Sequence, residues 1–230
     1  MNKATNTAIN AKNVLGLNDS HIHYFNEALG IHKDMVAAFL QLQRAAAKDG
    51  FDLKIASGYR SFAKQLAIFN AKLADDRPVL DLNNQPVDVA NLSASEKINS
   101  ILLFSALPGG SRHHWGTDID IYDPNLLAGK ALQLEPWEYQ AQGPFVPLTQ
   151  WLDENMALFG FYRPYDKYRG GVAIEPWHIS YQPIASLYTE QLSIDLLHDC
   201  IQQSDILEKA EILVMLDSIY QRFIINVGTP

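Results

Sequence analysis

The chain has 230 residues, a formal net charge of −8 at pH 7 and 47% hydrophobic residues. A chain of this length can bury the core of one domain without disulfides. The acidic balance and the lack of a basic run argue against a nucleic-acid partner, and no apolar run approaches the length of a transmembrane helix. Cys200 is the single cysteine, which excludes an intramolecular disulfide and a cysteine-based zinc cluster, and its apolar neighbours favour a buried structural thiol.

The first part of the chain predicts a lead-in followed by helices and one short strand. Residues 1–20 are expected to be flexible, and Met1–Lys12 lacks the apolar segment of a signal peptide. Apolar spacing predicts a helix over 32–48, and alternation predicts a strand over 53–57. Ser61 is expected to cap the helix that follows.

The next segment, residues 74–92, is rich in turn residues and predicts either a small hairpin or a plain surface insertion. Ser93 and Glu96 have the spacing of a capping box and open a predicted helix through Ser105. Residues 117–122 then alternate cleanly, with apolar side chains on one face and two carboxylates on the other. Such a polar face is turned either to solvent or to a functional site.

The last part predicts a helix that begins near Pro147 and ends at Gly160. Residues 161–171 are expected to be a solvated loop, and 172–181 to be one or two strands broken at Pro176. Two helices are predicted in the tail, over 184–202 and 206–223. Short strands among helices without a βαβ rhythm predict an α+β fold, with a small antiparallel sheet, flanking helices and C-terminal helices.

Three side chains have the chemistry of a catalytic zinc site. His113 precedes the carboxylate strand, Asp120 lies on its polar face, and His178 lies on a distant strand. A catalytic zinc takes three such ligands and leaves a position open. Glu175 lies three residues before His178, and a break at Pro176 would bring both into one cleft, where Glu175 would serve as a general base.

Arg60 lies in a loop at the end of a strand, where functional residues often occur. A guanidinium there would stabilise the negative charge of a tetrahedral intermediate or hold a substrate carboxylate. The alternative is that Arg60 pairs with a surface acid. His21, His23, His32 and His198 fit no ligand spacing and are expected to be surface or helix residues.

The motifs together resemble the VanY-type zinc D-alanyl-D-alanine carboxypeptidases. Their group includes D-Ala-D-Ala dipeptidases, L-alanyl-D-glutamate endopeptidases and the Hedgehog domain. The resemblance covers about Asp52 to Tyr181 and rests on three motifs in the family's order, which are Ser57-Gly58-Tyr59-Arg60-Ser61 with Gln65, Ser111-x-His113-x-x-Gly116-x-x-x-Asp120, and Glu175-Pro176-Trp177-His178.

The resemblance implies a role for each matching residue. His113, Asp120 and His178 match the zinc ligands, Glu175 the catalytic base and Arg60 the residue that stabilises the transition state. The positions implied to line the substrate pocket are Tyr59, Gln65, Ser111 and Trp177. The family often has alanine where this chain has Asp118, which is therefore either an alternative ligand or a hydrogen-bond partner of a ligand histidine. His114 is expected to be a packed or hydrogen-bonded neighbour of His113.

These observations predict a zinc metallopeptidase that hydrolyses D-amino-acid-containing peptides of peptidoglycan, with D-alanyl-D-alanine carboxypeptidase activity favoured. An L-alanyl-D-glutamate endopeptidase, a D-Ala-D-Ala dipeptidase and a zinc-bearing binding module without catalysis are the alternatives. The expected division is a lead-in over 1–25, a peptidase domain over 26–183 and a helical extension over 184–230 packed on it. The expected partner is a stem peptide or its fragments; the sequence indicates neither the oligomeric state nor a choice between the cell envelope and cytoplasmic wall recycling.

Overall fold

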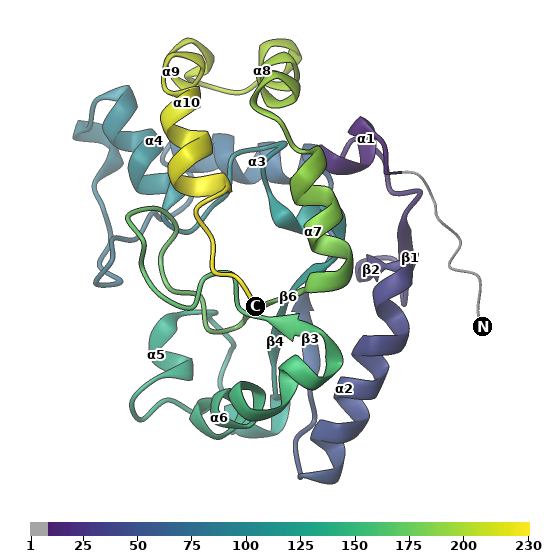
Figure 1. The fold of residues 1–230 in the computed structure, drawn as a ribbon. Coiled ribbons are helices and arrows are strands. Elements are labelled where there is room, and N and C mark those ends of the chain that lie inside the picture. The colour runs from purple at the N-terminus through teal and green to yellow at the C-terminus, as the bar shows by residue number, and fades with distance from the viewer. Residues whose placement is uncertain (1–8) are drawn as a thin grey trace.

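The computed structural model describes residues 9–230, and the first eight residues of the predicted lead-in lie outside this range. The fold is α+β, as the sequence predicts (Figure 1). Its centre is a four-stranded antiparallel sheet in the order β3-β4-β6-β5, formed by β3 (Lys54–Ser57), β4 (Asp118–Tyr122), β6 (His178–Tyr181) and β5 (Phe161–Tyr162). A separate hairpin pairs β1 (Ile22–Tyr24) with β2 (Gly30–His32).

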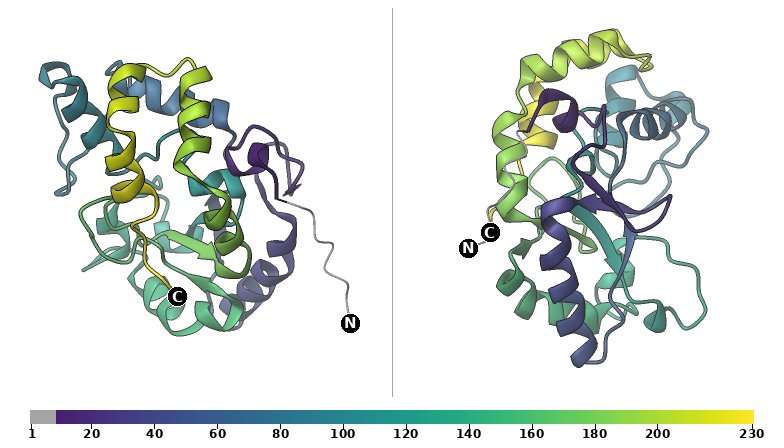
Figure 2. Two further views of the ribbon diagram at one scale, coloured as in Figure 1. Left: turned by 45° about the horizontal axis from the view of Figure 1, so that its top comes forward. Right: turned by 90° about the vertical axis from the view of Figure 1, so that its right-hand side faces the viewer.

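Helices surround the sheet and make up most of the C-terminal part (Figure 2). The α-helices are α1 (Ala11–Val14), α2 (Val36–Lys48), α3 (Phe62–Leu73), α4 (Ala94–Leu102), α5 (Pro136–Tyr139), α6 (Val146–Asn155), α7 (Gln182–Gln191), α8 (Ile194–Gln203), α9 (Lys209–Val214) and α10 (Leu216–Ile219). Across residues 9–230, no helix is both long and apolar enough to cross a membrane.

Local sequence signals explain where the predicted helices begin. The Ser61 hydroxyl accepts a hydrogen bond from the Lys64 amide at the start of α3, and Ser93 with Glu96 forms the predicted capping box of α4. The 74–92 segment forms a small hairpin-like turn with a bridge between Leu80 and Pro86. These three predictions are confirmed.

One face of the sheet is apolar and packs against two helices. Ile119 and Ile121 of β4 are fully buried in a core that includes Leu42 of α2 and Leu148 of α6. Because side chains alternate along a strand, the other face of β4 carries Asp118 and Asp120. Burying the apolar face therefore fixes the side on which the two carboxylates lie.

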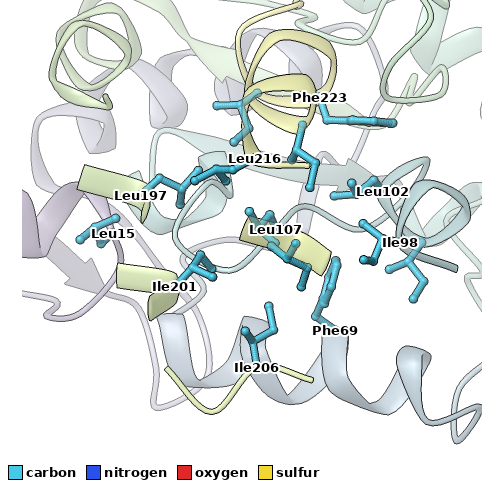
Figure 3. Close-up of a cluster of buried hydrophobic side chains, with 14 of the residues drawn as sticks. Leu15, Phe69, Ile98, Leu102, Leu107, Leu197, Ile201, Ile206, Leu216 and Phe223 are labelled. Atoms are coloured by element: carbon cyan, nitrogen blue, oxygen red, sulfur yellow. The ribbon is translucent and has the colours of Figure 1, made fainter. Parts of the chain in front are cut away.

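A second core joins α3 and α4 to the C-terminal helices (Figure 3). Phe69 of α3, Ile98 of α4 and Ile201 of α8 are each fully buried in this cluster. Val14 and Leu15, which lie in the predicted lead-in, are buried in the same cluster. The expectation that residues up to 20 are flexible is therefore wrong for this part, because α1 supplies apolar side chains to the core.

Four predicted elements differ in the structure. Residues 161–171 begin with the edge strand β5, and 172–177 form no strand, since β6 starts only at His178. Each predicted tail helix is divided: Leu192 leaves the helical conformation and Ser193 caps α8, while Met215 separates α9 from α10. A side-chain cap at Ser193 competes with continuation of the apolar helical pattern.

Two histidines expected at the surface or on a helix are buried in the interior. His21 Nδ1 lies 2.8 Å from the side-chain nitrogen Nδ2 of Asn13, and His21 Nε2 lies 2.9 Å from the His114 carbonyl oxygen. His32 lies 3.2 Å from the Tyr188 hydroxyl and accepts a hydrogen bond from the Asp34 amide. Both rings pack near Tyr188 of α7, and the His32 amide donates to the Gly116 carbonyl, so the prediction is wrong for these two residues.

Candidate metal centre and substrate cavity

The register of the sheet brings two predicted ligands together. Asp120 of β4 lies directly opposite His178 of β6, and Ser57 of β3 lies opposite Asp120 on the other side. Directly opposed residues of antiparallel strands place their side chains on the same face. That face is the polar one, so Asp120 and His178 meet although 58 positions separate them in the chain.

His113 is brought to the same place by a short 3₁₀ turn. Arg112–Trp115 forms this turn, and Gly116 ends it with a left-handed backbone at φ +67°. A Cβ atom at Gly116 would lie 2.8 Å from the His32 amide nitrogen, so glycine suits the position for both conformation and space. The chain then turns directly into β4, and His113 Nε2 lies 3.5 Å from Asp120 Oδ2.

The three side chains fit a metal ion by geometry and by hydrogen bonding. One possible ligand atom from each lies within 4.8 Å of the others, and all three residues are buried. Asp120 Oδ1 and His178 Nδ1 lie 3.2 Å apart, but neither makes a hydrogen bond of good geometry within the described part of the chain. Buried polar atoms normally have partners, and a set of two imidazoles and one carboxylate is typical of catalytic zinc.

The second nitrogen of each ligand histidine faces an acceptor. His113 Nδ1 lies 3.0 Å from the Gly58 carbonyl oxygen, and His178 Nε2 lies 3.0 Å from Asp118 Oδ1. Each acceptor favours a proton on the nitrogen that it contacts, which leaves the other nitrogen of the ring as an electron-pair donor to a metal. The two histidines are thus held in the tautomers that a metal site requires.

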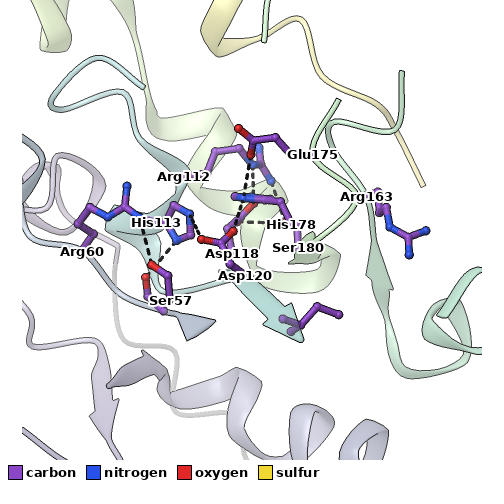
Figure 4. A network of polar contacts seen from close by, with 12 residues as sticks. Ser57, Arg60, Arg112, His113, Asp118, Asp120, Arg163, Glu175, His178 and Ser180 are labelled. Carbon is purple, nitrogen blue, oxygen red and sulfur yellow. Dashed lines mark hydrogen bonds and ion pairs between the residues drawn. The ribbon is translucent and has the colours of Figure 1, made fainter. Parts of the chain in front are cut away.

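Asp118 is the centre of a buried polar network (Figure 4). Its Oδ1 also accepts a 2.7 Å hydrogen bond from Arg112 Nε, and its Oδ2 accepts hydrogen bonds from Thr117 and Ser180. Arg112 also donates to the Ser180 hydroxyl. Asp118 therefore supports His178 and is not one of the three clustered ligands, which answers the alternative left open by the sequence.

Glu175 lies beside the candidate ligands. A turn through Pro176 is closed by the hydrogen bond from the His178 amide to the Glu175 carbonyl, and Glu175 Oε2 lies 3.5 Å from His178 Nδ1. The predicted break at Pro176 thus brings both side chains into one cleft. Burial raises the pKa of Glu175 to about 8, although nearby His178 opposes the increase.

The electrostatics of the centre favour a positive charge between the carboxylates. Burial opposes a charge on His178, but the hydrogen bond to Asp118 and the nearby Asp120 carboxylate outweigh it and raise the pKa of His178 to about 9, a positive charge that a bound metal ion would replace. Burial lowers the pKa of His113 to about 3, which keeps that ring neutral. The carboxylates therefore attract a cation at the position where the ligand atoms converge.

Arg60 faces this centre and is held in place by two side chains. Its guanidinium donates to Gln65 Oε1 at 2.9 Å and to Ser57 Oγ at 3.1 Å. Gln65 is fully buried and donates in turn to the Ala106 carbonyl. Arg60 forms no ion pair with a surface acid in residues 9–230. Gln65 contacts Arg60 and does not line the cavity, in contrast to its expected place in the pocket wall.

The centre opens into a cavity of about 560 Å³, a size typical of sites for small ligands. Ser111 and Trp177 line it, and the Ser111 hydroxyl has no partner in the described chain. The 74–92 segment contributes a wall through Pro78, Leu80 and Asn84. Tyr59 lies elsewhere: its hydroxyl donates to the Asn18 carbonyl in a separate surface hollow, so its predicted place in the pocket is wrong.

Three residues of the site were not identified from the sequence. Tyr165 belongs to the segment expected to be solvated, yet it is buried with its ring 4.9 Å from that of His178. Arg112 and Lys72 line the cavity but belong to none of the roles that the motifs imply. The only sequence signal for Lys72 is that it lies seven residues after Gln65, a spacing that places both side chains on the same face of α3.

His114 is the hydrogen-bonded neighbour that the sequence predicts. Its Nδ1 lies 2.6 Å from the Arg60 carbonyl oxygen, and its Nε2 accepts a hydrogen bond from the Gly109 amide. The Arg60 amide in turn donates to the His113 carbonyl. These bonds join the loop that carries Arg60 to the turn that carries His113, and so fix the distance between the arginine and the metal centre.

Comparisons with known proteins agree with this site. Residues 28–184 match the family model "VanY: D-alanyl-D-alanine carboxypeptidase". An uncharacterized protein of Haemophilus influenzae is 41% identical over 122 residues, which are 52% of this chain and 93% of that protein. A D-alanyl-D-alanine carboxypeptidase of Enterococcus faecalis is 31% identical over 150 residues, which are 64% of this chain. The match spans only 46% of the Enterococcus protein.

Two solved structures are similar in both sequence and fold. A mutant of the vancomycin-resistance D,D-pentapeptidase VanY in complex with Zn(II) is 27% identical, with a TM-score of 0.52 over 76% of this chain and 88% of the other. VanYB in complex with D-alanine-D-alanine is 25% identical, with a TM-score of 0.53 over 81% and 91%. With two thirds of its length matched by the family model, the chain belongs to the VanY D-alanyl-D-alanine carboxypeptidase family, whose zinc peptidases act on peptidoglycan peptides.

Proposed function

We propose that the protein is a zinc-dependent D-alanyl-D-alanine carboxypeptidase that removes the terminal D-alanine from peptidoglycan stem peptides. The observation that carries the proposal is the position of Glu175, whose Oε2 lies 3.5 Å from the candidate ligand atom of His178 in a cavity open to a peptide. The complexes of the relatives with Zn(II) and with D-alanine-D-alanine support the metal and the substrate class.

Metal binding and proton transfer are carried out by different residues in the proposed hydrolysis. Zinc, when bound by His113, Asp120 and His178, supplies a Lewis acid that makes water a nucleophile at neutral pH. Glu175, whose ionised form is favoured by a metal cation beside it, accepts a proton from the attacking water and returns it to the amine that leaves as D-alanine. The proton therefore moves from water to the carboxylate and then to the leaving nitrogen, which balances the reaction.

Arg60 stabilises the negative charge that develops on the carbonyl oxygen. Its guanidinium is fixed by Ser57 and Gln65 before substrate arrives, and a cation that is already oriented needs little reorganisation during the reaction. A binding module without catalysis would need neither Arg60 nor Glu175. Both side chains face the cavity, and this favours the enzyme over the non-catalytic alternative.

The test is release of D-alanine from a stem pentapeptide by the zinc-loaded protein. Glu175→Ala and chelation are each expected to lower kcat by at least 100-fold, because one removes the proton acceptor and the other the metal. Glu190→Ala, a change at an exposed residue of α7, is the matched control and is expected to retain activity. Hydrolysis of free D-alanyl-D-alanine with the pentapeptide left intact would assign a D-Ala-D-Ala dipeptidase, and cleavage between L-alanine and D-glutamate would assign an endopeptidase.

A further inference from the structure

Lys72 is a cation on the wall of the cavity that no acid neutralises. It lies on the last turn of α3 and lines the cavity with Arg60. Among the described residues, no carboxylate oxygen lies within 4.0 Å of its ammonium group. Lysine side chains that leave bulk water are normally paired. An unpaired one is unexpected in a chain of net charge −8.

The acids that line the same cavity have other partners. Asp120 and Glu175 belong to the candidate metal centre, and Glu135 accepts a hydrogen bond from the Trp137 indole. The end of α3 interacts favourably with a positive charge, but no hydrogen bond from the Lys72 ammonium to this helix is found in residues 9–230. The ammonium is therefore available to a ligand in the cavity.

Burial and nearby positive charges make an anionic ligand favourable here. Burial lowers the pKa of Lys72 to about 8, and Arg77 and Arg60 lower it further while Glu175 opposes them. Those two arginines also form no ion pair among the described residues. A carboxylate placed beside Lys72 would relieve the mutual repulsion of three cations and stabilise the charged form of the amine.

Asn84 supplies a second unsatisfied group to the lining of the cavity. It belongs to the 74–92 segment, and its Oδ1 is buried without a partner in the described chain. Its backbone is left-handed, at φ +59°, a conformation that asparagine tolerates better than most residues. A buried carbonyl oxygen left unpaired costs free energy.

We propose that Lys72 forms a subsite that binds a carboxylate of the substrate peptide, in a cavity to whose lining the 74–92 segment contributes Asn84. This rests on the proposed function for the identity of the substrate. The carboxylate is either the C-terminal one or one carried by a residue nearer the N-terminus. In both cases Lys72 determines specificity, since it favours the acid over the corresponding amide, and the 74–92 segment takes part in recognition.

Binding measurements separate this subsite from catalysis. The host is the zinc-loaded Glu175→Gln protein, which binds peptide without turning it over. The probes are a stem pentapeptide, the same peptide with a C-terminal amide, and versions in which each upstream carboxylate is amidated. Calorimetry is expected to show that one amide weakens binding about tenfold or more, since a hydrogen bond to a charged group is lost.

The variants show whether Lys72 is responsible. In the host one amidated peptide is expected to bind more weakly than the unmodified acid peptide. When Lys72→Met is added, that amidated peptide is expected to bind within about twofold of the acid peptide, whereas Lys72→Arg retains the preference for the acid peptide. Lys64→Met removes a charge from an exposed position of the same helix and is expected to keep the full preference. The amide that loses affinity identifies which carboxylate Lys72 binds.

Two results would overturn the subsite. One is an acid-over-amide preference of the same size with and without Lys72, and the other is equal binding of all the peptides by the host. Release of D-alanine by the wild-type protein is measured separately, so loss of the subsite and loss of the proposed carboxypeptidase activity are distinguishable. Failure of the host to bind any peptide, together with no release, would overturn both proposals.

Discussion

Asp118 joins a fully buried arginine to a candidate zinc ligand, and its position explains why a strand carries a second carboxylate. One of its oxygens is 2.7 Å from Arg112 Nε and 3.0 Å from His178 Nε2. Contact with a carboxylate makes an imidazole more basic and fixes its orientation. The pair of Arg112 and Asp118 is buried but well hydrogen-bonded, the condition under which such a pair persists.

Replacing Asp118 with asparagine tests this role. Asp118→Asn keeps the shape of the side chain but removes its charge, so His178 becomes a weaker donor. Zinc affinity is expected to fall about 10- to 100-fold, the usual effect of losing such a partner. Competition with a chromophoric chelator measures the affinity, and circular dichroism confirms that the variant is folded.

The control for Asp118 is the same substitution at an exposed acid. Asp217→Asn on α10 is expected to bind zinc as the wild type does. Unchanged affinity in Asp118→Asn would mean that His178 is oriented by the surrounding structure alone, without help from the carboxylate.

For single residues, the sequence predicted positions in the site correctly where motif spacing fixes the local backbone. The spacing of His113, Asp120 and His178 predicted a group that the structure brings within 4.8 Å. Lys72 and Tyr165 were missed because their places depend on how α3 and the 161–171 segment pack against the sheet. Tyr59 was placed in the pocket because it neighbours Arg60, although adjacent residues point in different directions.

At the scale of elements, the signals that succeeded were local. Capping by Ser61 and by Ser93 with Glu96 marks helix starts that the structure confirms. The two-residue strand β5 was missed because it exists only through its pairing with β6. The tail helices were predicted too long because the apolar spacing continues across Ser193, where a side-chain cap starts a new helix.

The C-terminal helices are expected to contribute to stability, because they share a core with α3 and α4. Ile201→Ala on α8 removes a fully buried side chain from that cluster and is expected to lower the free energy of unfolding by about 2–5 kcal/mol. Urea unfolding followed by circular dichroism measures the change. A loss below about 0.5 kcal/mol would show that these helices unfold independently of the rest.

An exposed residue of the neighbouring helix provides the comparison. Val214 on α9 is 81% exposed, so Val214→Ala removes apolar atoms that gain little from folding. Its effect is expected to stay within about 0.5 kcal/mol of the wild type. The contrast between the two variants separates burial from any general weakness of the C-terminal helices.

At the scale of the whole molecule, buried histidines connect segments that are far apart in the chain. His21 links α1 to the turn that carries the metal centre through Asn13 and the His114 carbonyl. His32 contacts Tyr188 of α7, 156 positions away. The sequence could not indicate these links, because a histidine in a short hairpin has the same local pattern whether the hairpin is exposed or covered.

These buried rings make stability depend on pH. Burial lowers the pKa of His32 from 6.5 to about 4, and the neighbouring His21 and Lys33 act in the same direction. The unfolded chain therefore binds more protons than the native protein between these values. The stability that the neutral His32 contributes is fully present above pH 6.5 and is lost as the pH falls toward 4. The contribution of this one group is on the order of 3 kcal/mol.

His32→Gln, which removes the ionisable ring, is expected to flatten this part of the pH dependence. Urea midpoints at pH 7 and pH 4.5 should therefore differ less in the variant than in the wild type, even if the variant is less stable at pH 7. His23→Gln, a change at an exposed position of β1, should leave the difference as it is. Equal loss on acidification in His32→Gln and wild type would mean that the pKa of His32 is the same in the folded and the unfolded chain, so that this ring does not contribute to the pH dependence.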